Sequence, residues 1–253
     1  MLHHPMADRR LDAELLIARR VMEDLLPRRT PQLEGFDIAG AHETSFEVGG
    51  DYYEFLPLDD NRWGIAIADV VGKGIAAALL VAAMRASLWA LVGQDLALRA
   101  ILRRANRFFR QSAEEGKFVT LFYGVLDVPM RRLIYVNAGH LPPILLHRDQ
   151  RVELLEEGGI PLGLFDEPRY FEGFARLEPG DVLTLYTDGI TEASNDADEP
   201  YGVERLTAAL LTHRHEPAAT ACAAIVEDVR RFGGAPADDQ TLVILKATDA
   251  SHR

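Results

Sequence analysis

Short hydrophobic runs separated by tight turns recur along most of this 253-residue chain, and they constrain its fold more than any other feature. Runs of this length, bounded by Gly, Pro, Asp and Asn, are typical of β-strands. The pattern predicts strands over residues 36–42, 52–58, 63–70, 118–127, 132–137, 144–147, 151–155, 171–177, 181–187 and 241–246. Because several connectors are as short as 59–61 and 128–131, we expect neighbouring strands to pair as antiparallel hairpins.

Two pairs of helices are predicted between these strands. The first pair covers 74–92, rich in Ala, Leu and Met, and 96–111; the second covers 202–213 and 217–232. Sequential hairpins combined with helix pairs indicate a layered α+β domain with antiparallel sheets, because a wound parallel sheet would alternate strands with single helices.

The N-terminal segment, residues 1–30, is expected to be distinct from the main domain at 31–247. Its residues 8–26 carry apolar side chains at helical spacing, and Pro27 ends the pattern. The predicted contact face is Leu11, Leu15, Ala18, Met22 and Leu25. Such a helix can pack on its own domain, bind a regulatory partner, or pair with a second copy of the chain.

Charge and composition exclude several classes of function. A net charge of −12 argues against a nucleic-acid partner, because phosphate neutralisation needs a basic surface. The single cysteine, Cys222, rules out a disulfide framework. The longest apolar stretch, 75–84, is too short for membrane insertion, and the N-terminus shows no secretory signal. We therefore expect a cytoplasmic protein.

Four aspartates, Asp51, Asp69, Asp188 and Asp238, each lie beside a turn at the edge of a hydrophobic run. Any one of them alone is best explained as a turn former or a helix cap. Together they predict a site for Mg²⁺ or Mn²⁺, since these ions take oxygen ligands and would offset the repulsion among carboxylates. In this interpretation Asp69 bridges two ions, whose shared water attacks a phosphoryl group.

The segments around these aspartates resemble a known family. They are Glu47-Val-Gly-Gly-Asp-Tyr-Tyr53, Ala68-Asp-Val-Val-Gly-Lys-Gly74, Asn137-Ala-Gly-His-Leu-Pro-Pro143, Thr187-Asp-Gly-Ile-Thr-Glu-Ala193 and Asp238-Asp-Gln-Thr241. In this order they are similar to the SpoIIE/RsbU-type serine/threonine phosphatases, bacterial members of the metal-dependent PPM superfamily. The resemblance extends from about residue 11 to residue 246.

The resemblance implies a four-layer α-β-β-α sandwich that hydrolyses phosphoserine or phosphothreonine on a protein, by attack of a metal-bridging water. The substrate it implies is a bacterial regulatory protein such as a STAS-type anti-sigma-factor antagonist. Asp69 and Asp188 would be catalytic, and the Val70 carbonyl would join the metal ligands. The implied metal ligands are Asp51, Asp69, Val70, Asp188 and Asp238, with Asp239 behind them orienting Asp238 or waters.

Two departures from the wider superfamily leave alternatives open. No histidine follows Asp69 to act as general acid, and Glu47 occupies the position of a phosphate-binding arginine. Lys73, with Gly72 and Gly189 beside the predicted ligands, is a candidate for substrate contact. A pseudophosphatase that acts by binding is therefore a second hypothesis, and a two-metal hydrolase of small phosphoesters is a third. For His140 a structural role before Pro142 is favoured over a catalytic one.

Overall fold

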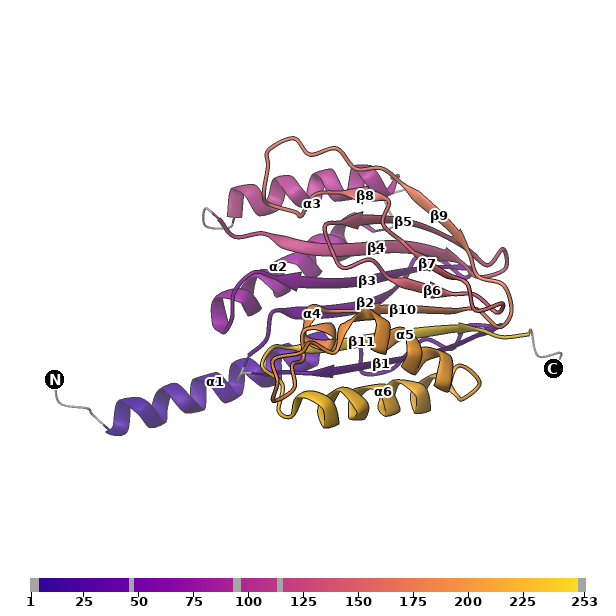
Figure 1. Cartoon of the computed structure of the whole chain (residues 1–253). Helices are drawn as coiled ribbons and strands as arrows, with labels where there is room; N and C mark the ends of the chain where they lie inside the picture. Colours follow the sequence, from indigo (N-terminus) through magenta and orange to yellow (C-terminus); the bar gives the residue numbers. More distant parts are fainter. Residues whose placement is uncertain (1–4, 46–47, 93–96, 113–115, 250–253) are drawn as a thin grey trace.

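A computed structural model of the chain describes residues 5–45, 48–92, 97–112 and 116–249 (Figure 1). Its strands form two sheets. The first sheet contains, in spatial order, β1 (Phe36–Glu43), β11 (Gln240–Ala247), β10 (Val182–Tyr186), β6 (Ile144–Leu146) and β7 (Val152–Leu154). The second contains β2 (Asp51–Pro57), β3 (Arg62–Val70), β4 (Val119–Asp127), β5 (Arg132–Ala138) and β8 (Gly158–Gly159), with β9 (Gly173–Arg176) also paired to β5.

Helices cover the outer face of each sheet, as Figure 1 shows. On the second sheet lie α2 (Ile75–Leu91) and α3 (Leu98–Ser112), and on the first lie α5 (Gly202–His213) and α6 (Ala218–Gly233). The remaining helices are α1 (Pro5–Leu25) and the single turn α4 (Asp188–Thr191). The predicted α-β-β-α sandwich is confirmed.

The central strands are hydrophobic on both faces because both faces are covered. In β3, Ile65 and Ile67 face the space between the sheets, while Ala66 and Ala68 pack under α2 and α3. Successive side chains of a strand point to opposite faces, so a strand buried on both sides shows a continuous apolar run instead of alternation. This is why the strands were visible in the sequence as short hydrophobic runs.

Two strand pairings bring the four predicted aspartates to one end of the sandwich. The β2–β3 hairpin is closed by Asp59, whose Oδ1 accepts hydrogen bonds from the backbone N–H groups of Asn61 and Arg62 at 2.9 and 2.8 Å. Its register places Asp51 directly opposite Asp69. In the other sheet β10 pairs antiparallel with β11, so Asp188 follows one strand where Asp238 precedes its neighbour.

The structure differs from the expectations in small elements. Neither β8 nor α4 was predicted, because two glycines and a single helical turn carry no periodic pattern. The strand expected at 171–177 is shorter, with β9 covering only Gly173–Arg176. The N-terminal helix begins at Pro5, and the side chain of Leu11 lies outside the described ones. Within the described residues, no helix combines the length and apolar character that crossing a bilayer requires.

Candidate metal centre

Asp51, at the start of β2, is fully enclosed and held by two threonines. Its Oδ2 accepts hydrogen bonds from the Thr187 hydroxyl at 2.6 Å and from the Thr241 hydroxyl at 2.7 Å. Burial, followed by repulsion from Asp69, holds the pKa of the Asp51 carboxyl well above its ordinary value, and the two threonines oppose that rise. Thr241 lies in β11 and Thr187 directly follows β10, so these bonds join the two sheets at the site.

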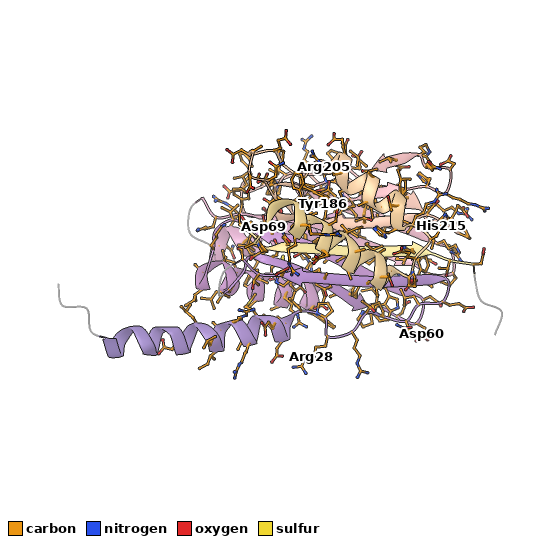
Figure 2. The ribbon with its side chains drawn as sticks, turned by 60° about the horizontal axis from the view of Figure 1, so that its bottom comes forward. Arg28, Asp60, Asp69, Tyr186, Arg205 and His215 are labelled. Atoms are coloured by element: carbon orange, nitrogen blue, oxygen red, sulfur yellow. The ribbon has the colours of Figure 1, made fainter. Side chains whose placement is uncertain are left out.

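Asp69 lies at the end of β3, opposite Asp51, and Figure 2 shows it at the other end of the sandwich from the hairpin residue Asp60. Burial raises its pKa to about 7, and the carboxylates of Asp188, Asp238 and Asp239 add to this rise. Lys73 acts in the opposite direction. Three neighbouring carboxylates therefore repel the negative charge of Asp69.

Asp188 opens α4 and is more exposed than Asp51. Burial, Glu192 and Asp238, in that order, raise the pKa of its carboxyl. The next residue, Gly189, allows a close backbone approach: a Cβ there would lie 2.1 Å from the carbonyl oxygen of Asp239. Gly189 therefore acts in the structure by bringing α4 against the segment before β11.

Asp238 forms an ion pair in which its Oδ2 lies 3.2 Å from the Lys73 ammonium nitrogen. Lys73 also donates to the Ala237 carbonyl at 3.2 Å. In the part of the chain that the structure describes, no three His, Cys, Asp or Glu side chains are gathered closely enough to hold an ion together. Because Lys73 is paired with the Asp238 carboxylate, a metal cation that binds Asp238 would compete with Lys73.

Asp239 is buried and holds the loop that leads into β2. Its Oδ1 accepts from the Ser45 N–H at 2.9 Å, and its Oδ2 accepts from the Gly50 N–H at 2.7 Å. A Cβ at Gly49 would lie 2.3 Å from Asp239 Oδ2, so only glycine fits there without movement. Asp239 supports the position of Asp51 through this loop, whereas Glu47 lies outside the described residues.

Val70 and Gly72 follow Asp69 at the edge of the site. The Val70 N–H donates to the Gly50 carbonyl at 3.1 Å, which ties β3 to the loop before β2. Gly72 has a φ of +117°, a conformation that favours glycine, and a Cβ there would lie 2.8 Å from the Lys117 ammonium nitrogen. Lys117 is therefore a second cation beside the predicted metal ligands.

Sequence reasoning did not assign roles to Thr187, Thr241 or Lys117. The threonines could have been noticed as hydroxyls at the polar ends of two otherwise apolar strands, next to predicted ligands. Nothing local marks Lys117, which reaches Gly72 only through the pairing of β4 with β3.

His140 is buried behind the site and bridges the sheets. Its Nδ1 lies 2.8 Å from the Thr120 hydroxyl oxygen, and its Nε2 lies 3.2 Å from the Tyr186 carbonyl oxygen. Burial lowers its pKa to about 4, so the ring is neutral at physiological pH. Both ring nitrogens are occupied by these contacts, which supports the structural role favoured from the sequence.

The donor chemistry of the cluster fits a hard divalent cation. The candidate ligands offer only oxygen atoms, which Mg²⁺ and Mn²⁺ prefer. Burial is the largest cause of the raised pKa values of Asp51, Asp69 and Asp188, and repulsion between neighbouring carboxylates adds to each rise. A bound cation would relieve that repulsion.

The chain is similar to known proteins. Residues 59–248 match the family model described as Stage II sporulation protein E (SpoIIE). The chain is 32% identical over 187 residues to "Phosphoserine phosphatase RsbU" of Bacillus subtilis, covering 74% of this chain and 56% of that protein. It thus spans about half the length of this curated relative.

Solved structures agree with the fold. One contains the RsbU and RsbW domains of Rv1364c from Mycobacterium tuberculosis, with a TM-score of 0.77, 27% identity, and coverage of 87% of this chain and 62% of that one. Another is the catalytic domain of the serine/threonine phosphatase PstP in complex with two manganese ions. Its TM-score is 0.61 at 19% identity, and the match covers 85% of this chain and all of that one, so this likeness concerns the fold.

Proposed function

The chain belongs to the SpoIIE family, and from that premise we propose that it is a metal-dependent protein phosphatase acting on phosphoserine or phosphothreonine. The observation that carries the proposal is the convergence of Asp51, Asp69 and Asp188 on one edge of the sandwich with raised pKa values. Carboxylates concentrated in this way, from strand ends far apart in the sequence, serve cation binding better than they serve stability.

The proposed ligands are the carboxylates of Asp51, Asp69, Asp188 and Asp238 and the carbonyl oxygen of Val70, holding two Mn²⁺ or Mg²⁺ ions. Such ions supply Lewis-acid polarisation of the phosphoryl oxygens and a nucleophile at neutral pH. That PstP, which has the same fold, was crystallised with two manganese ions supports this proposal.

The chain's own side chains would orient the ligands and the substrate. Thr187 and Thr241 fix the rotamer of Asp51, and Asp239 fixes the loop in front of it. Lys73 and Lys117 are the cations that the described structure brings to the Gly72 turn. We assign them to substrate phosphate binding, a role for which the sequence offers no arginine at position 47.

The proposed substrate is a phosphorylated bacterial regulatory protein, such as a STAS-type anti-sigma-factor antagonist, in the cytoplasm. The name of RsbU, a phosphoserine phosphatase, supports a protein phosphoserine. The pairing of RsbU with RsbW domains in Rv1364c supports a place in the same kind of regulatory system.

A second candidate function is a pseudophosphatase that acts by binding alone. The Lys73–Asp238 ion pair favours it, because Lys73 holds a proposed ligand. The family match and the raised carboxyl pKa values favour the enzyme.

Turnover separates these candidates. We expect Mn²⁺ to stimulate release of phosphate from a phosphoserine peptide by the wild-type chain. Asp69→Asn or Asp188→Asn should lower the rate of this release by a factor of about 10³ or more. Asp60→Asn, at the far end of β3, is the matched control and should leave turnover unchanged. Circular dichroism verifies that each variant is folded. Wild-type protein that releases no phosphate with Mn²⁺ or Mg²⁺ would support the binding module instead.

A further inference from the structure

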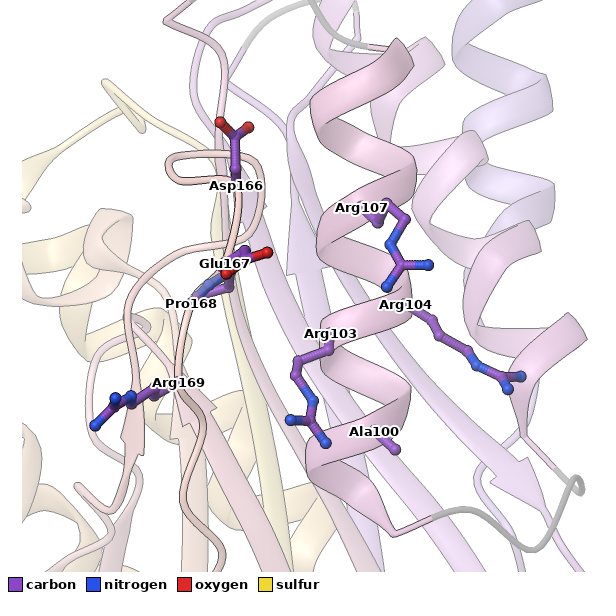
Figure 3. A pocket seen from close by; sticks show the side chains of 8 residues that line it. All are labelled: Ala100, Arg103, Arg104, Arg107, Asp166, Glu167, Pro168 and Arg169. Atoms are coloured by element: carbon purple, nitrogen blue, oxygen red, sulfur yellow. The ribbon is translucent and has the colours of Figure 1, made fainter.

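A groove of about 510 Å³ runs between α3 and the segment 166–169, and arginines dominate its lining (Figure 3). The groove gathers positive charge in a chain whose net charge is −12. It lies outside the metal centre, which draws on β2, β3, α4 and the segment before β11. The lining residues are Ala100, Arg103, Arg104, Arg107, Asp166, Glu167, Pro168 and Arg169.

The helix is built to present these arginines outward. One face of α3 buries Leu102, Ala105 and Phe109 in the core beneath the second sheet. Arg103 and Arg107, four residues apart, share a face of the helix and are exposed. Figure 3 shows Arg103 on the side of the helix toward the segment 166–169, whereas Arg104 and Arg169 point away from the groove.

The wall opposite α3 is fixed by hydrogen bonds. Asn106, which is buried, accepts from the Gly163 N–H at 2.8 Å and donates to the Phe165 carbonyl at 2.9 Å. Arg110 pairs with Asp166 at 2.8 Å, which neutralises one of the two acidic residues of the lining. The groove is therefore preformed, so a ligand would not have to order it.

Arg103 and Arg107 have no ion pair with any residue that the structure describes. Glu167 is the remaining carboxylate of the lining, so the positive charges outnumber the negative ones. Phe165, directly before Asp166 of the lining, is 57% exposed. Arginine beside exposed aromatic residues is typical of protein-binding surfaces.

Strand pairing connects the segment before the groove wall with the metal centre. Val70 pairs with Val119, and Val119 pairs in turn with Leu162, which immediately precedes the groove wall. Lys117 lies between the two sites, since its ammonium is beside Gly72 and its carbonyl is beside Gly163. Two strand spacings separate Val70 from Leu162, a distance of about 10 Å.

We propose that this groove, the α3 groove, docks an acidic segment of the same phosphoprotein whose phosphoserine enters the metal centre. The inference rests on the proposed function and adds a substrate class to it: proteins with a cluster of Asp or Glu near the phosphorylated residue. From Leu162, the centre of the groove is about 10 Å further in the direction of the α3 axis. The total of about 20 Å corresponds to roughly six residues of extended chain between the cluster and the phosphoserine.

Two phosphoserine peptides test the inference directly. They are identical except that four residues, centred six positions from the phosphoserine, are all Glu in one and all Gln in the other. With Mn²⁺ we expect the Glu peptide to have a KM about tenfold lower at an equal kcat, because docking contributes binding and not chemistry. Arg103→Glu with Arg107→Glu should remove this advantage and leave turnover of the Gln peptide unchanged.

The matched control is Arg29→Glu with Arg148→Glu, which changes the net charge by the same amount at exposed positions outside the groove. It should retain the preference for the Glu peptide. Binding of fluorescein-labelled peptides without phosphate, followed by anisotropy, reports docking separately from turnover. We expect the Glu peptide to bind and the affinity to fall as salt rises.

The outcomes separate the two proposals. Equal KM values for both peptides, or equal loss in both double variants, would overturn the inference and leave the phosphatase intact. Binding of the Glu peptide without any turnover would overturn the phosphatase and keep the α3 groove as an acidic-peptide site. Tighter binding of phosphatidylserine vesicles or duplex DNA than of the Glu peptide, lost in the groove variant, would assign the surface to those ligands and overturn the inference.

Discussion

Asp69 combines burial with three carboxylate neighbours, and together they raise the pKa of its carboxyl to about 7. Its folded-state pKa lies above the ordinary 3.8, so protonation favours the folded state and ionisation opposes it. The metal-free protein should therefore lose stability as the pH rises from about 4 to about 7. This loss of stability is what a residue placed for cation binding, as proposed for Asp69, would cost the metal-free fold.

Asp69→Asn should accordingly stabilise the metal-free protein at pH 8, by roughly 1 to 4 kcal/mol, because the amide carries no charge to bury. The gain should shrink as the pH falls toward 4. Thermal unfolding in EDTA across this pH range, with Asp60→Asn as the exposed control, measures it. An Asp69→Asn variant less stable than wild type at pH 8 would contradict this account of the site.

The aspartates were predictable because each is marked locally, by a hydrophobic run on one side and a turn on the other. Their supporting residues were not. Thr187 and Thr241 reach Asp51 across the gap between the sheets, and Lys117 reaches Gly72 across a strand pair. Such contacts depend on tertiary packing, which a single sequence does not display.

Among the elements, α1 is the least integrated into the domain. Figure 1 shows it extending beyond the sandwich, and Met22 near its end, with Leu26 just after it, packs on the core. Leu16, Ile17 and Val21 are 57%, 61% and 54% exposed. This apolar face differs from the one predicted from the spacing of Leu15, Ala18, Met22 and Leu25, whose side chains are half-buried.

We expect this exposed face of α1 to support self-association. Replacing Leu16, Ile17 and Val21 by Glu should convert a dimer to a monomer, because each apolar side chain loses about 1.5–3 kcal/mol of burial. Light scattering coupled to gel filtration measures the change, and Arg20→Gln on the same helix is the control. A wild-type chain that is monomeric at 100 μM, on the order of a weak dimer's dissociation constant, would rule the proposal out.

Strands and long helices could be predicted from the sequence because the apolar residues that mark them are the ones buried in the core. The shortest elements did not: β8 consists of two glycines in a parallel pair with β5, and α4 exists because β10 ends beside β11. The β2–β3 register, in contrast, was foreseeable from the Asp59–Asn61 turn. That register alone places Asp51 opposite Asp69.

At the scale of the whole molecule, charge is divided between two regions of opposite sign. The carboxylates gather at the end of the sandwich between the sheets, and the free arginine pair, Arg103 and Arg107, lies on the helical layer beside it, within the part of the chain described here. A substrate that carries a phosphate and an acidic segment would complement both regions together. The arrangement of layers, which the sequence predicted, brings these two regions close enough for one extended peptide to reach both.

Calorimetric titration of Mn²⁺ into chelator-treated, dialysed protein measures whether the aspartate cluster binds divalent cations. We expect a dissociation constant in the micromolar range for the wild type, which corresponds to a binding free energy on the order of −8 kcal/mol. Asp188→Asn should weaken it at least about a hundredfold, and Asp60→Asn should leave it unchanged. If the wild type binds Mn²⁺ no more tightly than millimolar, or if Asp188→Asn binds it as tightly as the wild type, the aspartates are not a metal centre.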